Sequence, residues 1–338
     1  MKNGIFFLIC IFCAAVNLPA QQLFNVQNGS KANFYADLET AIQQAVSGDT
    51  IYLPGRPIQV QNNLVIDKRL TIIGAGWDMD SIGGISISDI KLPNGSYVSI
   101  NFREGSDGSL ITGCYIGPIT FGYTDGSGTH DNISNVTIWR NRISGGSIIT
   151  LSAQVTQIFI SENLLGNYID GKNASNCIIN NNLGAYVTYF VNTLIYNNIF
   201  NNNFCVINSS GCTVENNFCT GTSISGCSNS YFNNNAFQGN ITFPNGTNEG
   251  SNNLVNQSLM YTFVVNDFSA PKNLVIRDDS PCKNAGSDGT DIGIYGGTTP
   301  YKPGAVPYNP HINRVDISGH TDKDGNIKVN IQASAQTR

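Results

Sequence analysis

Charge is what this 338-residue chain has least of. Charged residues make up 12% of it, about half the share of an ordinary globular protein. Hydrophobic residues make up 41%, which is enough for a core, so the low charge does not indicate disorder. The net charge of -5 excludes the basic surface that binds nucleic acid. We therefore expect no nucleic-acid partner, and an acidic polymer would need a local basic patch.

Long apolar runs are missing as well. The longest begins near the amino terminus, where Lys2 precedes an apolar run over residues 5–16 and a small residue stands at Ala20. This run is shorter than the roughly 18 residues that span a bilayer, so we expect no integral membrane segment. The pattern predicts a signal peptide over residues 1–20 and a secreted protein.

The cysteines do not form the even set that is typical of a disulfide framework. Seven would remain after cleavage: Cys114, Cys177, Cys205, Cys212, Cys219, Cys227 and Cys282. The odd count, with spacing similar to the repeat described next, favours buried thiols that pack as small hydrophobes. Export would still permit a bridge.

What the chain does contain is a short repeat within residues 133–237. It reads apolar, any, apolar, any, any, Asn, any, apolar, and its first copy covers residues 136–143. Successive asparagines are 22, 19, 16, 19 and 18 residues apart, at Asn141, Asn163, Asn182, Asn198, Asn217 and Asn235. Each copy is one supersecondary unit that has to stack on its neighbours to bury its apolar face.

Two solenoids place asparagine after alternating apolar residues, the leucine-rich repeat and the parallel β-helix. The shortest spacing lies below the period of about 20 at which leucine-rich repeats begin. The intervening segments are rich in Gly, Asn, Ser and Thr rather than in helix formers. We predict an all-β fold, a right-handed parallel β-helix over residues 50–297 with roughly ten coils and a ladder of buried asparagines. Cys114 is expected at the same position in an earlier coil.

Both ends of the solenoid are expected to carry appendages. Residues 21–49 predict a cap with a helix that begins after Asp37, because apolar residues follow it at helical spacing. Such a cap prevents edge-to-edge pairing of the first coil. The glycine-rich residues 279–297 predict a tight final coil. Residues 298–338 predict a proline-rich linker and a β-hairpin with its turn at residues 322–326.

The amino-terminal stretches DLETAIQQAVSGDTIYLPG and LVIDKRLTIIGAG, at residues 37–55 and 64–76, resemble the start of pectate-lyase-like β-helix proteins. The resemblance is closest to secreted polysaccharide lyases of the alginate lyase and chondroitinase B type. Residues 279–297 resemble the closing segment of secreted β-helix proteins from Bacteroidetes-type bacteria. The resemblance implies a β-helix and a polysaccharide ligand. Those lyases use a Lys or Arg base beside an Arg, often with calcium, and no repeated charged cluster here matches that set.

Two outward columns of the aligned repeats are the predicted ligand surface. One column reads Trp139, Ser161, Asn180, Tyr196, Glu215 and Asn233, and its neighbour reads Thr137, Phe159, Ile178, Leu194, Thr213 and Tyr231. Rings interleaved with amides and a carboxylate suit sugars, although strand propensity alone also enriches aromatics on a sheet. The predicted substrate-binding residues are Trp139, Arg140, Arg142, Tyr196 and Glu215.

An inserted loop at residues 122–132 supplies the catalytic candidates. It contains Asp125, His130 and Asp131, and the candidates for acid–base chemistry are His130 and Asp131 together with Arg142. The alternative is a solvated turn of Gly and Asp. We predict no metal site, although two acidic pairs are candidate calcium ligands: Asp288 with Asp291, and Asp322 with Asp324.

The sequence therefore predicts a secreted, monomeric β-helix protein that binds or processes a polysaccharide on the outer face of its solenoid. If it is an enzyme, a polysaccharide lyase or a glycoside hydrolase is expected. The alternative is a non-catalytic structural or adhesive cell-surface protein.

Overall fold

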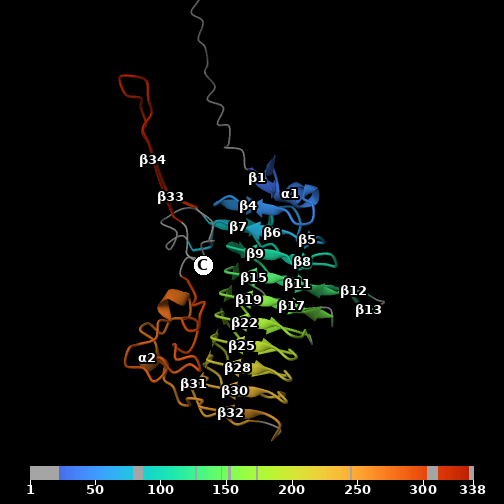
Figure 1. Cartoon of the computed structure of the whole chain (residues 1–338), viewed down its shortest axis with the longest axis vertical. Helices are drawn as coiled ribbons and strands as arrows, with labels where there is room; N and C mark the ends of the chain where they lie inside the picture. The colour runs from blue at the N-terminus through green and yellow to red at the C-terminus, as the bar shows by residue number, and fades with distance from the viewer. Residues whose placement is uncertain are drawn as a thin grey trace, which may run out of the picture.

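The computed structural model describes residues 23–78, 87–125, 128–145, 147–150, 154–172, 174–243, 246–302 and 311–334. Most of this chain is wound into a parallel β-helix of about nine turns (Figure 1). The predicted all-β solenoid is confirmed. The predicted signal peptide, and the part of the predicted linker at residues 303–310, lie outside the described residues.

Three sheets run along the solenoid. The 12-stranded sheet contains, in spatial order, β2 (Lys31–Tyr35), β1 (Phe24–Asn28), β3 (Thr50–Tyr52), β6 (Thr71–Ile73), β9 (Leu110–Thr112), β15 (Thr137–Trp139), β19 (Phe159–Ser161), β22 (Ile178–Asn180), β25 (Leu194–Tyr196), β28 (Thr213–Glu215), β30 (Tyr231–Asn233) and β32 (Glu249–Ser251). The 9-stranded sheet contains β31 (Ala236–Phe237), β29 (Phe218–Cys219), β26 (Ile199–Phe200), β23 (Leu183–Gly184), β20 (Leu164–Leu165), β16 (Arg142–Ile143), β10 (Cys114–Ile116), β7 (Ser88–Lys91) and β4 (Pro57–Gln59). The 7-stranded sheet contains β27 (Val206–Ile207), β24 (Val187–Thr188), β21 (Ile169–Asp170), β17 (Ile148–Thr150), β11 (Ile119–Phe121), β8 (Ile100–Phe102) and β5 (Leu64–Ile66). A short parallel pair, β14 (Ile133–Ser134) with β18 (Val155–Thr156), joins two of the turns.

The core follows from the alternation of side chains along each short strand. From β3 to β30, the middle residue of each strand of the 12-stranded sheet points inward, and the equivalent residues of successive turns stack on one another. One such stack is almost completely buried: Ile138, Ile160, Ile179, Ile195, Val214 and Phe232. Because every turn repeats this arrangement, the apolar interior is continuous along the solenoid.

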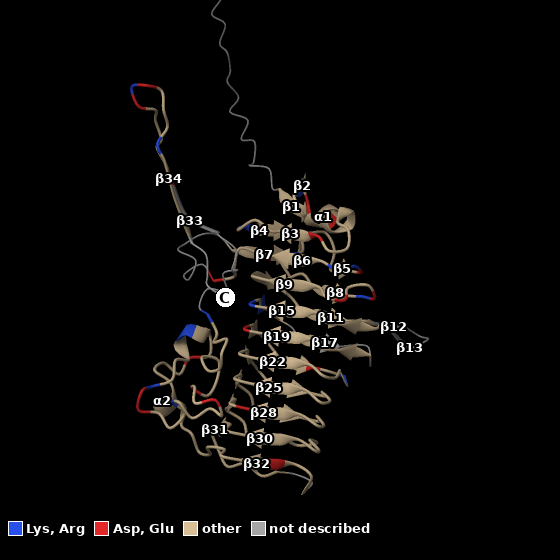
Figure 2. Cartoon of the chain, viewed as in Figure 1, with Lys and Arg blue, Asp and Glu red and all other residues tan. Residues whose placement is uncertain are grey.

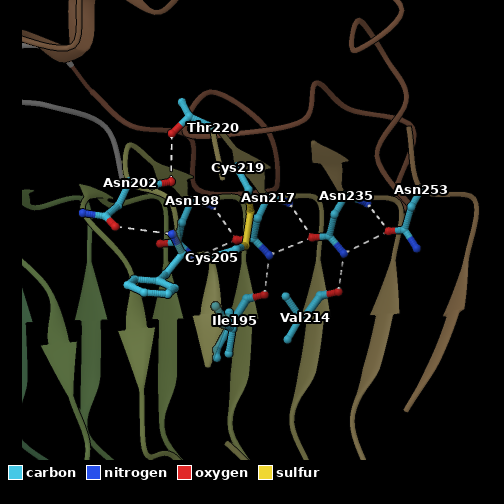
Figure 3. Close-up of a disulfide and its surroundings, with 12 residues drawn as sticks. Ile195, Asn198, Asn202, Cys205, Val214, Asn217, Cys219, Thr220, Asn235 and Asn253 are labelled. Atoms are coloured by element: carbon cyan, nitrogen blue, oxygen red, sulfur yellow. Dashed lines mark hydrogen bonds between the residues drawn. A yellow bond between two sulfur atoms is a disulfide. The ribbon is translucent and has the colours of Figure 1, made fainter. Parts of the chain in front are cut away.

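The predicted asparagine ladder is confirmed. Each side-chain Nδ2 donates to Oδ1 of the next ladder residue over 2.9–3.3 Å, from Asn141 through the five later asparagines of the repeat. The ladder continues one step further, from Asn235 to Asn253 (Figure 3). At the other end the backbone N–H of Cys114 donates to Asn141 Oδ1 over 3.1 Å, which places Cys114 in the ladder position of the earlier turn, as predicted.

The residue before each ladder asparagine has a left-handed backbone. Its φ lies between 53° and 57° in seven successive turns, at Arg140, Glu162, Asn181, Asn197, Asn216, Asn234 and Asn252. Asparagine tolerates this conformation better than most residues do, which explains the repeated Asn-Asn pairs. The two-residue turn joins the 12-stranded sheet to the 9-stranded sheet, and the side chain of its first residue lies at the outer corner of the solenoid while that of the ladder asparagine is buried.

The predicted appendages at the two ends are present. Helix α1 (Leu38–Gln44) begins after Asp37, whose carboxylate accepts a hydrogen bond from the Thr40 N–H over 2.7 Å. Three of its side chains, Leu38, Ala41 and Ile42, join the core. A carboxy-terminal hairpin pairs β33 (His311–Ile317) with β34 (Val329–Ser334).

The predicted final coil at residues 279–297 is wrong. After β32 the chain forms the short helices α2 (Leu259–Thr262) and η2 (Pro271–Asn273) and then returns along the outer face of the 9-stranded sheet (Figure 1, orange). That face is apolar and requires a cover. Leu183, Ile199, Phe218 and Ala236 of the sheet form a second core with Phe263, Leu274, Ile276, Ile292 and Ile294. We call residues 285–302 the strap.

The cysteines are mostly buried thiols, as expected, but one pair is bridged. Cys205 and Cys219 form a disulfide with their Cα atoms 5.6 Å apart (Figure 3). The other five cysteines after residue 20 are buried and free. In the part of the chain that the structure describes, no helix has the length and apolar character to cross a membrane.

Candidate ligand groove

The two outward columns have the predicted register. In the first, Trp139, Ser161, Asn180, Tyr196, Glu215 and Asn233 follow one another across paired strands. In the second, Leu194 and Tyr231 are 45% and 50% exposed. Sequence alternation therefore predicted the outward register correctly. Ser161 and Asn180 of the first column are nevertheless buried, so that part of the predicted ligand surface is not accessible.

The strap lies along one side of this face and is held by the left-handed asparagines. Nδ2 of Asn181 donates to the carbonyl oxygens of Ile294 and Gly296 over 2.8 and 3.0 Å. Asn216 Nδ2 donates to Ser287 Oγ over 3.1 Å, and its Oδ1 accepts from the Ser287 N–H over 2.8 Å. Asn234 Nδ2 donates to a further strap carbonyl. Three asparagines one or two turns apart thus fix the strap parallel to the solenoid axis.

Glycine permits the strap to approach this closely. A Cβ on Gly296 would lie 1.8 Å from the Asp291 carbonyl oxygen and 2.4 Å from Asn197 Nδ2. Gly297 adds a φ of 80°, which residues with a side chain rarely adopt. These two glycines therefore allow the strap to turn against the corner of the solenoid.

A groove of about 340 Å³ lies between the strap and the 12-stranded sheet. Its floor is formed by β25 and β28, through Leu194, Tyr196, Thr213 and Glu215. Its wall is formed by the strap residues Ser287, Asp288, Gly297 and Thr298, with Asn197 and Asn216 at the corner. The volume lies at the lower end of the range for sites that bind small molecules or sugar units.

Tyr196 is the aromatic residue of the groove. The side chain is partly buried on the outer face of β25. Burial raises the pKa of its phenol above the ordinary value of 10.0, so the hydroxyl keeps its proton at neutral pH. Because this hydroxyl makes no hydrogen bond to the described residues, it is able to donate one to a ligand.

Glu215 follows Tyr196 in the same column, one turn further on. Its Oε1 accepts from Asn233 Nδ2 over 3.3 Å, and its Oε2 accepts from Ser287 Oγ over 3.4 Å. Both bonds are long, so the carboxylate retains acceptor capacity. Neither Glu215 nor Asp288 has an ion-pair partner among the described residues.

Arg140 is not available to a ligand, which corrects its prediction as a substrate-binding residue. Its side chain is 1% exposed, and its Nε donates to Glu162 Oε2 over 2.8 Å. Its guanidinium also lies over the Trp139 ring, with Cζ 4.7 Å from the ring centroid. The Trp139 Nε1–H donates to Glu162 Oε1 over 2.9 Å. Trp139 is therefore outward, as predicted, but part of a buried network rather than a free platform.

Arg142 lies on a different sheet from Trp139, so the predicted pairing of these two residues at one ligand is wrong. Since the corner takes only two residues, Arg142 already belongs to β16 of the 9-stranded sheet. Its Cζ lies 4.5 Å from the ring centroid of Tyr115, which in turn stacks on Tyr97. The prediction treated the two positions as one face because the sequence does not show the corner.

The inserted loop forms a hairpin, β12 (Tyr123–Asp125) with β13 (Gly128–His130), that projects on the side away from the strap (Figure 1). The side chains of Asp125 and His130 lie outside the described residues. Asp131 follows β13 and accepts a hydrogen bond from Arg103 Nε. Asp131 and Arg142 are thus held by different partners on different parts of the solenoid, and neither lines the groove.

No cluster of three or more metal-ligating side chains occurs within the described ranges. Asp288 Oδ1 accepts from the Thr290 N–H and hydroxyl, and Asp291 accepts from Lys283 Nζ and the Asn284 N–H. The Asp322 carboxylate closes the hairpin turn by accepting from the N–H groups of Asp324 and Asn326. These carboxylates therefore accept hydrogen bonds from turn N–H groups and, at Asp291, from Lys283.

The geometry defines a parallel β-helix protein with a groove between its outer face and a carboxy-terminal strap. Searches against protein-family models and against curated proteins found no match. The groove contains two of the five predicted substrate-binding residues, Tyr196 and Glu215. It also contains Ser287 and Thr298, which sequence reasoning missed, and Asp288, which the sequence suggested only as a calcium ligand. The signal that could have indicated the strap was the series of Asn-Asn pairs, because the first Asn of each pair presents its amide at the corner.

Proposed function

We propose that this protein is secreted and binds a polysaccharide in the groove between β25, β28 and the strap. Tyr196 supplies an aromatic ring and a hydroxyl donor, and Glu215 supplies a hydrogen-bond acceptor one turn away. Sugars combine an apolar ring face with hydroxyl groups, so an aromatic ring beside directional polar groups is the surface that suits them.

One observation carries this proposal. Tyr196 and Glu215 are neighbours in register on paired strands, and both line a groove that the chain builds from segments far apart in sequence. The floor comes from residues 194–215 and the wall from residues 287–298.

Export and a distant relationship to pectate-lyase-like proteins of the secreted Bacteroidetes type are part of the proposal. The charged, apolar and small-residue regions of residues 1–20 support a signal peptide. The Cys205–Cys219 disulfide supports an oxidising compartment. The amino-terminal motif and the helix at residues 38–44 support the relationship.

Binding without turnover fits the groove best. Glu215 and Asp288 are the carboxyl groups among its lining residues, and hydrolysis by the usual route would need one as acid and the other as base or nucleophile. An assay for reaction products distinguishes binding from turnover. Oligosaccharide release that is lost in both Glu215→Gln and Asp288→Asn would make the protein a glycoside hydrolase, and new unsaturated ends would make it a lyase.

The experiment that tests the proposal is a polysaccharide screen followed by calorimetric titration of the best ligand. Tyr196→Ala should weaken binding about tenfold, since a well-placed aromatic contact contributes about 1–2 kcal/mol. The matched control is Tyr231→Ala, an exposed tyrosine on the same sheet outside the groove. Equal affinity of Tyr196→Ala and the wild type, with both variants folded, would contradict this siting.

A second candidate, an adhesive surface protein, is favoured by the carboxy-terminal hairpin. Ile317, Val329 and Ile331 are 65%, 49% and 61% exposed, and a two-stranded hairpin is marginally stable without a partner. Removal of residues 303–338 separates the two functions. It should abolish surface attachment if the protein is an adhesin, and should leave glycan binding unchanged if the groove is the site.

A further inference from the structure

We infer that the groove takes a glycan whose sugars carry protonated amino groups. The inference rests on the proposed function of the groove and adds the chemical class of the ligand. It follows from the charges of the residues that line the groove and from the hydrogen-bond acceptor capacity that their carboxylates retain.

Every charged side chain that lines the groove is acidic. Glu215 stands on the floor and Asp288 on the strap wall, and no Lys or Arg lines it. The basic residue closest in sequence to Asp288 is Lys283, and its Nζ is paired with Asp291 over 3.0 Å. Figure 2 shows how few charged residues the solenoid carries, so distant side chains do little to offset these two carboxylates.

Both carboxylates retain acceptor capacity. Glu215 accepts two hydrogen bonds of 3.3 and 3.4 Å from neutral donors, whereas Glu162 elsewhere in the chain is paired with Arg140 over 2.8 Å. Asp288 uses its Oδ1 for Thr290, and its other oxygen accepts no hydrogen bond from the described residues. A carboxylate that lacks a cationic partner at a partly enclosed site favours a ligand that supplies one.

The same charges disfavour a glycan built of uronic acids. Its carboxylates would face Glu215 and Asp288, and the whole chain carries a net charge of -5. A neutral glycan avoids this repulsion but leaves the carboxylates with ordinary hydroxyl donors. An ammonium group donates charge-assisted hydrogen bonds to a carboxylate and also interacts favourably with the face of a ring such as that of Tyr196.

The test compares three soluble probes by titration calorimetry with the full mature chain: a glucosamine oligomer, its fully N-acetylated counterpart, and a galacturonic acid oligomer of the same length. The glucosamine oligomer should bind at least about tenfold more tightly than the N-acetylated oligomer, which corresponds to about 1.4 kcal/mol. The preference should shrink as salt is raised, because Glu215 is only partly buried and Asp288 is exposed. The galacturonic acid oligomer should bind weakest.

Two variants assign the preference to the groove. Glu215→Gln and Asp288→Asn should each reduce the preference for the amino sugar while leaving the affinity for the N-acetylated oligomer nearly unchanged. Glu249→Gln is the matched control, because Glu249 is an exposed carboxylate on the same sheet outside the groove. Thermal melting of each variant verifies that it is folded.

Two outcomes overturn the inference and leave the proposed function intact. One is that the N-acetylated oligomer or another neutral or acidic glycan binds as tightly as the amino sugar. The other is that Glu249→Gln reduces the preference as much as Glu215→Gln does, since the attraction would then come from overall charge. Failure of every polysaccharide class to bind the wild type would instead refute the proposed function itself.

Discussion

Arg140 and Glu162 form an ion pair in successive turns of the solenoid, with Nε and Oε2 2.8 Å apart and side chains that are 1% and 2% exposed. Both residues have the left-handed φ that asparagine holds in the later turns, at 54° and 53°. The Trp139 indole donates to the second carboxylate oxygen of Glu162. At this end of the corner these three side chains bond mainly to one another, and the strap adds one contact of 3.4 Å from the Lys302 N–H to Glu162 Oε2. Further along, the asparagines bind the strap directly.

Loss of one partner of this pair should destabilise the protein strongly. Glu162→Leu leaves a buried guanidinium without its carboxylate, and we expect a loss of about 3–5 kcal/mol in the free energy of unfolding, measured by urea denaturation. The double variant Arg140→Met with Glu162→Leu should recover most of the loss, because no buried charge is left. The control is Asp279→Asn in the exposed pair with Arg277, which should leave stability nearly unchanged.

The asparagine ladder should be intolerant of an apolar replacement. Asn198 donates to Ile179 O, Tyr196 O and Asn217 Oδ1, and it accepts from Asn182. Since each unsatisfied buried group costs about 1–3 kcal/mol, Asn198→Leu should cost more than about 3 kcal/mol. Asn201→Leu, at an exposed site three residues later, should change the melting temperature little. Similar melting of both variants would show that the ladder adds no stability.

The strap should loosen when its asparagine contacts are removed. Asn181→Gly keeps the left-handed backbone but deletes the two hydrogen bonds to Ile294 and Gly296, and also the one that Asn181 Oδ1 accepts from Asn180 Nδ2. We expect faster amide hydrogen exchange over the strap with little change in the solenoid strands. Asn252→Gly is the matched control, because Asn252 has the same φ and its side chain makes no hydrogen bond to the described residues. Faster exchange in both variants would contradict this role of Asn181.

Alkaline pH should destabilise the protein through its buried thiols. Burial raises the pKa of Cys114 and of Cys212 from 9.0 to about 12, and that of Cys177 to about 11. In the unfolded chain these thiols ionise near their ordinary pKa, so their contribution to stability is complete below about pH 9 and is lost as pH rises toward the folded pKa. Each such thiol should cost about 1.4 kcal/mol per pH unit in that window.

Urea denaturation at about pH 8 and about pH 10 measures this loss. The variant Cys212→Ala provides the comparison, because it removes one titrating thiol and should show a smaller decrease between the two pH values. An unchanged pH dependence in this variant would show that the Cys212 thiol is not protected from ionisation in the folded state.

The sequence was sufficient for those parts of the fold that repeat. Asn141 and its equivalents recur at the turn, and apolar residues such as Ile138 recur two positions before the corner, so alternation alone predicted the ladder and the outward columns. The sequence repeat predicts the ladder and the columns because each turn of a solenoid contacts only its neighbouring turns.

The strap and the position of Arg142 on the 9-stranded sheet could not be predicted from the periodicity of the sequence. Strap contacts join Asn181 to Ile294 and Gly296, more than 100 residues away, and they involve backbone carbonyls that any residue supplies. The corner at Arg140 and Asn141 is only two residues long, so a linear pattern places Arg142 beside Trp139 although the chain has already turned onto another sheet. The groove exists only where the strap meets the sheet, and thus the sequence identified residues of its floor, such as Tyr196 and Glu215, but not its wall.

A crystal structure of the protein with the oligosaccharide that binds it most tightly tests the central claim most directly. The account predicts sugar density between the strap and β25–β28, with a hydroxyl or amino group within hydrogen-bond distance of the Tyr196 hydroxyl and the Glu215 carboxylate. A sugar bound on the 7-stranded sheet or on the hairpin at residues 311–334, with this groove filled only by solvent, would contradict it.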